Sequence, residues 1–198
     1  MVSAILLAAG ESKRMGEQDK LFLKYKGNWI INHTMQNLWA SNKSELIIIM
    51  NNNDNDLLNG QESKKIQVVI NPNFRQGMTT SIQVGVRAAS TDASGYMICL
   101  ADQPLTKKED YNTIIERFEL LIRHDSKSII VPFYNGVKGN PVIFSSAYRN
   151  DILAHQKMEG CKKIVEANKQ HVYMIEMMND HILSDVDTPK DYEILVNR

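Results

Sequence analysis

Apolar residues occur in short runs along this chain, and polar or turn-forming residues separate the runs. Runs of this length that are rich in isoleucine and valine are typical of buried strands. The runs that fit this pattern are residues 2–7, 46–50, 66–70, 96–100, 129–131, 142–144 and 171–177. We expect each of them to form one strand.

Amphipathic stretches lie between most of these runs, with apolar residues at helical spacing. They are residues 29–40, 79–89, 110–124 and 162–168. Alternation of strands and helices in a chain of 198 residues predicts an α/β fold. We therefore expect a Rossmann-like, mostly parallel sheet with helices on both faces, in one domain that spans residues 1–198.

Residues 132–144 break the alternation, because two short apolar runs flank the dipeptide Asn135-Gly136. Asn-Gly is a strong signal for a tight turn between antiparallel strands. This segment predicts an antiparallel hairpin inserted into the α/β pattern. The asparagine- and aspartate-rich residues 51–55 predict a surface loop.

Composition and charge exclude several classes of partner. Apolar residues make up 43% of the chain, and 23 basic side chains balance 23 acidic ones. Zero formal net charge gives no broad attraction to nucleic acid or to an anionic membrane, and no apolar segment approaches the length of a membrane span. Cys99 and Cys161 lack metal-ligand or redox spacing. We expect a cytoplasmic protein without zinc or a disulfide.

Residues 7–16 read LAAGESKRMG and follow the first predicted strand, and Lys20 comes shortly after them. Small residues let the backbone approach a ligand and direct several N–H groups at phosphate oxygens, and Gly16 allows a dihedral angle that most residues avoid. Arg14 and Lys20 add two cations. The loop is neither a Walker A sequence nor a dinucleotide fingerprint, so it predicts a different kind of triphosphate site.

With Lys20, this loop resembles the signature of molybdenum cofactor guanylyl- and cytidylyltransferases. Residues 71–81, 100–104, 136–144 and 185–189 resemble further motifs of these enzymes, in the family's order. The set covers nearly the whole chain. It is most similar to the cytidylyltransferases, which include accessory proteins that mature xanthine dehydrogenases.

The resemblance implies a nucleotidyltransferase with a fold like that of nucleotide-diphospho-sugar transferases. It implies Mg²⁺ as cofactor, CTP or GTP as donor, and a molybdopterin-type acceptor for a recipient molybdoenzyme. The catalytic residues it implies are Arg14, Lys20 and Asp102. The nucleotide-binding residues it implies are Leu7, Ala8, Ala9, Gly10, Arg14, Lys20, Gly77, Ser81 and Asp102. The acceptor-binding residues it implies are Lys138, Gly139, Asn140 and Pro141.

Asp102 directly follows the strand predicted at residues 96–100, and ligands of open α/β sheets bind at the carboxyl ends of strands. Mg²⁺ binds through one or two carboxylates plus phosphate oxygens. Asp102 and Asp187 are the predicted metal ligands if Asp187 reaches across the crevice, and Asp185 is a weaker candidate. In the alternative reading, Asp102 and Asp187 cap the helices that follow them.

Two features of the sequence leave the substrates open. Residues 138–141 read Lys-Gly-Asn-Pro where relatives carry a motif closer to Arg-Gly-His-Pro, so forked phosphate binding and a titratable ring are both lost. Ala9 resembles the cytidylyl branch and predicts CTP. The spacing between Gly16 and Lys20 resembles the guanylyl branch instead.

The reaction predicted is attack by an acceptor phosphate on the α-phosphorus of CTP with release of pyrophosphate. Positioning and charge neutralisation then carry the catalysis. A guanylyltransferase of the same family, and a cytidylyltransferase for a sugar or methylerythritol phosphate, remain open. So do a non-catalytic carrier of finished cofactor and a nucleotide-binding regulatory module. The five histidines show no ligand spacing and are predicted to be structural.

Overall fold

The computed structural model describes residues 1–16, 18–51 and 66–198 and centres on an eight-stranded sheet. Its strands lie in the order β10-β7-β9-β6-β1-β4-β5, and β8 pairs with β7 outside this path. They are β1 (Val2–Leu7), β4 (Glu45–Met50), β5 (Ile66–Ile70), β6 (Gly95–Leu100), β7 (Ile129–Tyr134), β8 (Val137–Lys138), β9 (Val142–Ser145) and β10 (Val172–Glu176). Each predicted run contributes a strand.

The sheet has a parallel part and a mixed part. Strands β6, β1, β4 and β5 are parallel to one another, so their carboxyl ends meet at one edge. Leu7, the last residue of β1, pairs with Leu100 at the end of β6. Strand β9 runs antiparallel between β6 and β7, and β10 is parallel to β7.

The predicted antiparallel hairpin is present. Strand β7 turns through Asn135 and Gly136, both with positive φ, into β8. Residues 139–141 then interrupt the returning strand before it resumes as β9. Gly139 donates its N–H to the carbonyl of Pro132 at 2.9 Å, and the peptide bond between Asn140 and Pro141 is cis. The predicted acceptor residues therefore lie at a break in a strand.

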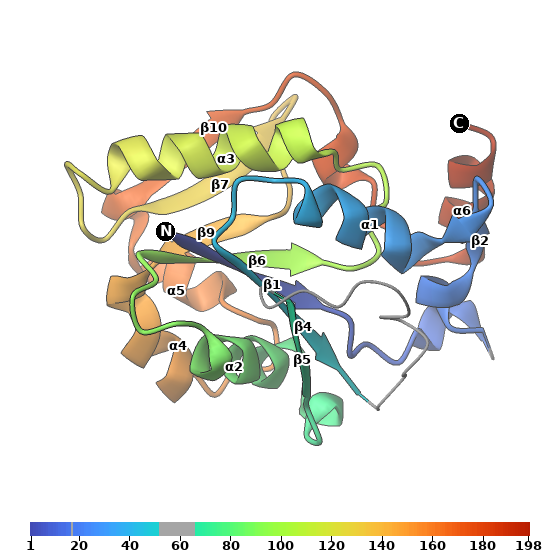
Figure 1. The fold of residues 1–198 in the computed structure, drawn as a ribbon, viewed down its shortest axis with the longest axis horizontal. Helices are drawn as coiled ribbons and strands as arrows, with labels where there is room; N and C mark the ends of the chain where they lie inside the picture. The colour runs from blue at the N-terminus through green and yellow to red at the C-terminus, as the bar shows by residue number, and fades with distance from the viewer. Residues whose placement is uncertain (17, 52–65) are drawn as a thin grey trace.

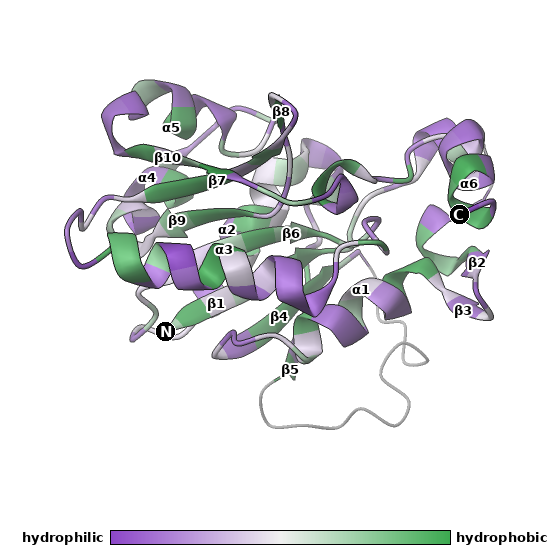
Figure 2. Cartoon of the chain, turned by 90° about the horizontal axis from the view of Figure 1, so that it is seen from above, coloured by the Kyte–Doolittle hydropathy of each residue, from purple (hydrophilic) through white to green (hydrophobic). Residues whose placement is uncertain are grey.

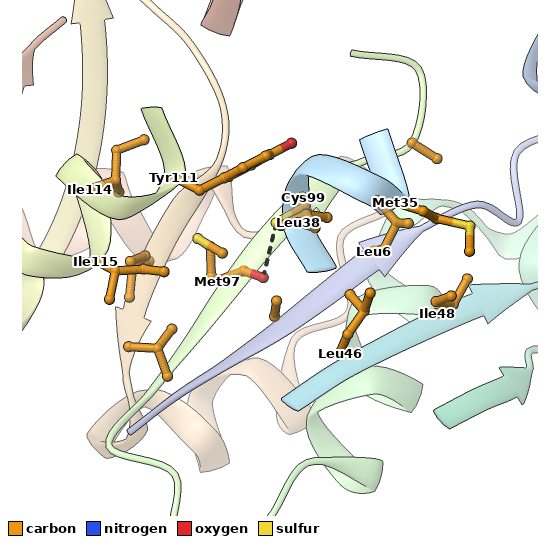
Figure 3. Close-up of a cluster of buried hydrophobic side chains, with 14 of the residues drawn as sticks. Leu6, Met35, Leu38, Leu46, Ile48, Met97, Cys99, Tyr111, Ile114 and Ile115 are labelled. Carbon is orange, nitrogen blue, oxygen red and sulfur yellow. Dashed lines mark hydrogen bonds between the residues drawn. The ribbon is translucent and has the colours of Figure 1, made fainter. Parts of the chain in front are cut away.

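Helices cover both faces of the sheet (Figure 1). Helices α1 (Ile30–Trp39) and α3 (Lys108–Leu121) pack on one face, and α2 (Met78–Ala88), α4 (Arg149–Ala154) and α5 (Lys162–Ala167) pack on the other. Figure 3 shows Met35 and Leu38 of α1 over Leu6 and Leu46 of the sheet. The mostly parallel, doubly covered α/β sheet is confirmed.

A small cluster lies beside the main sheet and was not predicted as an element. Strands β2 (Lys24–Tyr25) and β3 (Asn28–Trp29) form a two-stranded hairpin, and helix α6 (Pro189–Val196) lies next to it (Figure 2). Buried side chains of Tyr25, Ile30, Val186 and Leu195 pack together there. The phenol of Tyr192 donates to the carbonyl of Lys24 at 2.7 Å. This cluster fixes the chain just after Lys20 and on both sides of Asp187, two residues of the site described below.

Two further expectations concern segments away from the site. In the loop predicted at residues 51–55, all but Asn51 lies outside the described residues. Both cysteines are buried free thiols, and burial raises the pKa of Cys161 to about 12. Among the described helices, none has the length and hydrophobicity that crossing a bilayer requires.

Candidate functional site

A cavity of about 460 Å³ opens at the carboxyl edge of the parallel strands, and we call it the first cavity. Predicted site residues that line it are Leu7, Ala9, Gly10, Arg14, Lys20, Gly77, Ser81, Asp102, Asp185 and Asp187. They come from the ends of β1 and β6, from the start of α2, and from the segment before α6. The fold thus brings together residues far apart in the chain, such as Lys20 and Asp187, which are 167 positions apart.

The loop after β1 begins as a continuation of that strand. Ala8 donates its N–H to the carbonyl of Ile49 at 2.9 Å, and its side chain belongs to the core. Sheet pairing therefore occupies the Ala8 N–H and keeps Ala8 out of the cavity lining. Gly10 is exposed, and a Cβ there would meet open space. Gly16 has φ of +70°, as its residue type predicted.

Lys20 is positioned by two residues that sequence reasoning did not assign to the site. Ser12 adopts left-handed backbone angles, and its hydroxyl donates to Oδ1 of Asp19 at 3.0 Å and accepts the N–H of Lys20 at 3.2 Å. The same Asp19 oxygen accepts the N–H of Leu21 at 3.0 Å, which caps the short helical turn Lys20–Phe22. The Ser12–Asp19 pair therefore holds Lys20 against the loop.

The ammonium group of Lys20 lies between two carboxylates. Its Nζ bonds to Oδ2 of Asp102 and lies 2.7 Å from Oδ1 of Asp187. Arg14 contacts the other oxygen of Asp187 at 2.8 Å. The side chains of Lys20 and Asp102 are 13% and 14% exposed, whereas that of Arg14 is 67% exposed. Lys20 is thus the inner cation of the site and Arg14 the outer one.

Burial and neighbouring charges shift the pKa values of four groups in the site: Lys20, Asp102, Asp185 and Asp187. Burial disfavours the charged form of Lys20, but the carboxylates of Asp102 and Asp187 raise its pKa overall. Burial raises the pKa of Asp102 against the opposing effect of Lys20. Loss of water raises the pKa of Asp185, and the nearby Asp102 and Asp187 charges add to that rise. For Asp187, Lys20 and Arg14 outweigh burial and lower the pKa.

The alternative reading of the two aspartates as helix caps does not match the structure. Helix α3 starts at Lys108, well after Asp102, and Thr188 is the N-cap of α6. Asp191 closes that cap by accepting the N–H groups of Thr188 at 2.7 Å and of Asp187 at 3.2 Å. Val186 also donates its N–H to the carbonyl of Asp102 at 3.0 Å. The cap and this backbone bond direct Asp187 towards Asp102.

The donor atoms fit a divalent cation bound together with a phosphate. Oδ1 of Asp102 is buried and has no hydrogen-bond partner. It lies beside the two carboxylate oxygens that contact the Lys20 ammonium, Oδ2 of Asp102 and Oδ1 of Asp187. No group of three or more His, Cys, Asp or Glu side chains suited to a metal occurs among the described residues. Mg²⁺ needs only one or two carboxylates when phosphate and water complete its shell, so Asp102 and Asp187 are sufficient donors.

The start of α2 forms the wall of the first cavity next to the loop. Gly77, with φ of +101°, precedes the helix, and both Gly77 and Ser81 line the cavity. Ser81 is buried, and its hydroxyl accepts a hydrogen bond from the Asn71 side chain at 2.9 Å. The same Asn71 amide donates to Thr80 at 2.9 Å. Asn71, which directly follows β5, fixes the helix start and was missing from the predicted site.

A second cavity of about 370 Å³ lies beside the first, and Met78 and Leu100 line both. Lys138, Gly139 and Asn140 of the predicted acceptor segment line it, whereas Pro141 does not. The remaining lining is largely apolar, with charged residues from α5 and the segment before it. These residues are Ile82, Ile98, Val131, Val142, Phe144, Val165, Glu159, Gly160, Cys161, Lys162 and Glu166. The predicted nucleotide and acceptor residues thus border two adjacent cavities.

Two exposed ion pairs that were not predicted join residues in the lining of the first cavity. Glu11 of the loop contacts Nε of Arg75 at 3.3 Å and Nζ of Lys13 at 2.9 Å. Both basic side chains are 77% exposed. Surface pairs of this kind contribute little to stability, so we assign Glu11 and Arg75 no role in holding the loop.

Three of the histidines make structural contacts away from the cavity. His33 bonds to the carbonyl of Tyr25 at 2.7 Å, and His171 pairs with Asp125 at 2.8 Å. His181 pairs with Asp110 at 2.9 Å and so helps to hold the segment that precedes Asp187. None of the five histidines lines the first cavity.

Comparison with known proteins gives a family and full-length relatives. The family model described as MobA-like NTP transferase domain matches residues 4–172. A molybdenum cofactor cytidylyltransferase of Escherichia coli is 25% identical over 192 residues, which cover 96% of this chain and 93% of the relative. A nicotine blue oxidoreductase of Paenarthrobacter nicotinovorans is 24% identical over 195 residues, which cover 94% of this chain and 92% of the relative.

A solved structure supports the fold. The crystal structure of Rv0371c from Mycobacterium tuberculosis superimposes with a TM-score of 0.84 at 23% identity. The superposition covers 100% of this chain and 97% of the Rv0371c chain. At that level of identity the likeness concerns the fold. It extends over the mixed sheet and the small C-terminal helix as well as the parallel strands.

Proposed function

Because the chain belongs to the MobA-like NTP transferase family, we propose that it transfers CMP from CTP to the phosphate of molybdenum-molybdopterin and releases pyrophosphate. The product would serve the maturation of a molybdoenzyme of the xanthine dehydrogenase type. The single observation that carries the proposal is Lys20 held between Asp102 and Asp187 at the carboxyl ends of β1 and β6. The cytidylyltransferase among the relatives supports the choice of base and acceptor.

The two cations have separate tasks in this proposal. Lys20, buried and bonded to both carboxylates, stabilises the charge that develops on the triphosphate as pyrophosphate departs. Arg14 lies at the exposed side of the site and binds the terminal phosphates. The backbone of Ala9 and Gly10 lines the same cavity and brings the phosphates towards these side chains.

Asp102 and Asp187 would hold the Mg²⁺ ion that the proposal requires. When bound, the ion neutralises phosphate charge and polarises the α-phosphoryl group. Asp102 supplies an unpartnered buried oxygen, and the N-cap of α6 keeps Asp187 directed at the same place. A second crystal structure of Rv0371c contains manganese, which supports a divalent cation in relatives of this fold.

The acceptor phosphate is already ionised at neutral pH, so no general base is needed. Lys138, Gly139 and Asn140 line the second cavity and are proposed to bind the acceptor beside the nucleotide. The wall shared by the two cavities contains Met78 and Leu100. Positioning two phosphates in adjacent cavities supplies the proximity that such a transfer needs.

The test incubates the protein with each of the four nucleoside triphosphates, Mg²⁺ and one acceptor, and identifies the product by mass. The acceptors are molybdenum-molybdopterin, molybdopterin, a sugar phosphate and methylerythritol phosphate. A cytidylylated pterin with stoichiometric pyrophosphate is expected. A cytidylylated sugar or erythritol phosphate would change the acceptor, a guanylylated pterin would change the base, and absence of pyrophosphate with every acceptor would refute the proposal.

A further inference from the structure

The first turn of α2 has residues on two sides. Gly77 and Ser81 line the first cavity, while Met78 lines both cavities. Thr79 lines neither cavity and is 3% exposed. Its side chain is directed at a different part of the chain, the segment of residues 155–161 that connects α4 to α5.

One hydroxyl group ties this connecting segment to α2. Oγ1 of Thr79 donates to the carbonyl of Lys157 and accepts the N–H of Gly160 at 3.1 Å. One turn later, the side-chain amide of Gln83 donates to the carbonyl of His155 at 2.8 Å. Thr79 and Gln83 thus satisfy backbone groups of this connection: the carbonyls of His155 and Lys157 and the N–H of Gly160.

Close packing reinforces these hydrogen bonds. A Cβ on Gly77 would lie 2.8 Å from the carbonyl oxygen of Met158 and 2.9 Å from its Cβ. A Cβ on Gly160 would lie 3.1 Å from Sδ of Met78. Both glycines have positive φ, and each lets the helix start and the connecting segment touch without an intervening side chain.

The same segment continues into the lining of the second cavity. Glu159, Gly160, Cys161 and Lys162 line this cavity together with Lys138, Gly139 and Asn140 of the hairpin. Part of the second cavity's wall is therefore held in place by the first turn of α2, and the other side of that turn lines the first cavity. A shift of residues 157–160 relative to α2 would therefore change the distance between a molecule bound in the first cavity and one bound in the second.

We propose that Thr79 is a positioning residue for the acceptor: by fixing residues 157–160 on α2, it sets the second cavity's wall relative to the bound nucleotide. The proposal rests on the function proposed above, because it takes the second cavity as the acceptor site. A misplacement of about 1 Å can cost roughly a hundredfold in rate when reaction depends on positioning. Loss of the hydroxyl therefore acts on the acceptor and leaves the nucleotide's own contacts in place.

The test compares Thr79→Val, which keeps the shape and removes the hydroxyl, with Thr79→Ser, which keeps the hydroxyl. The matched control is Thr113→Val on α3, where an exposed threonine donates its hydroxyl to the carbonyl of Glu109 in the same helix. Binding of CTP with Mg²⁺ is measured by calorimetry without acceptor. Pyrophosphate release then gives kcat and the acceptor KM with molybdenum-molybdopterin. Hydrogen exchange at the Gly160 amide reports the bond itself.

We expect Thr79→Val to raise the acceptor KM about tenfold or more and to lower kcat, with CTP affinity within twofold of the parent and faster exchange at Gly160. Thr79→Ser should restore the acceptor KM, and Thr113→Val should match the parent throughout. An unchanged acceptor KM in Thr79→Val, or an equal loss of CTP affinity, would overturn the proposal. If Thr79→Val does not fold, failure of Thr79→Ser to keep the parental acceptor KM and Gly160 protection overturns it instead.

Failure of the proposed function is a separate result. In that case the parent protein itself releases no pyrophosphate, whatever residue occupies position 79. Faster exchange at Gly160 in Thr79→Val would still report the hydrogen bond to Gly160, but the acceptor role would fall with the function.

Discussion

The two cavities differ in where their charges lie. In the first cavity, Lys20 and Asp102 are nearly buried and bonded to each other, and Asp187 joins them from the far end of the chain. In the second cavity the lining is largely apolar, and Lys138 and Lys162 are exposed. Buried, preorganised charge suits the stabilisation of phosphoryl transfer, whereas an apolar lining with exposed charged residues suits recognition of a substrate. Substitutions should therefore affect chemistry in the first cavity and acceptor affinity in the second.

The substitution expected to have the largest effect on the chemistry of the first cavity is Asp102→Ala. It removes a proposed metal ligand, so pyrophosphate release should fall by roughly 10² to 10³-fold or more. The melting temperature should change by only about 2–4 °C, the equivalent of about 1 kcal/mol in a chain of this size, because little core volume is lost. Steady-state kinetics and a thermal scan measure both, with Asp92→Ala at an exposed position as control. Normal turnover in Asp102→Ala would remove the metal assignment.

A second comparison lies within the first cavity. Lys20→Ala and Arg14→Ala should each weaken triphosphate binding and turnover by about ten- to a hundredfold, since one charge-assisted contact contributes roughly 1.5 to 3 kcal/mol. Lys20→Ala should show the larger loss, because Lys20 is 13% exposed and Arg14 is 67% exposed. Lys108→Ala is the control, because this exposed lysine pairs with Glu109 and lines neither cavity. Kinetics equal to the parent in both variants would show that neither side chain contributes to triphosphate binding or turnover.

The second cavity should respond differently to loss of a charge. Lys138→Ala should raise the acceptor KM about two- to fivefold, the effect of an exposed charge, with no change in CTP affinity. Lys127→Ala, at an exposed position outside both cavities, should behave like the parent. Acceptor titrations at saturating CTP measure the difference. A fall in CTP affinity in Lys138→Ala would show that the two cavities do not divide the substrates as proposed.

The smallest effect concerns the base. In competition between equal CTP and GTP, the parent should favour CTP, and Ala9→Gly should reduce that preference about twofold. The change stays below the roughly tenfold that one methylene in a pocket contributes, because Ala9 acts by restricting the loop backbone. Mass analysis of the nucleotidylated pterin gives the ratio. Predominant guanylylated product from the parent would refute the choice of CTP.

The sequence predicted the large elements well because their apolar runs are long enough to show a period. Strand β1 and helix α2 lie within a residue of their expected bounds. Strands β2 and β3 were missed because two residues show no alternation, although Lys26 and Gly27, both with positive φ, form the turn between them. Helix α4 was missed, whereas α5, which also has six residues, was predicted.

Within the site, residue type predicted some positions and contacts decided others. Asp102 could be placed at the ligand-binding edge of the sheet because it follows a buried apolar run. That Asp187 would lie close to it was implied only by the family resemblance. Ser12 was not assigned, since nothing about serine indicates left-handed backbone angles. Thr79 could not be assigned either, because its partners belong to a connection whose position depends on tertiary packing. The catalytic and binding roles remain predictions that the experiments above test.

The contact between Lys20 and Asp187 joins residues 167 positions apart, and this separation has a consequence during synthesis. At about 5–20 residues per second, a ribosome needs roughly 8 to 33 seconds to travel from one codon to the other. Throughout that time the nascent chain carries the loop and Lys20 without the carboxylate that completes the group. A polypeptide released by a ribosome that stalls between codons 102 and 187 would therefore contain the phosphate loop and Asp102 but lack Asp187, the second of the two proposed metal ligands.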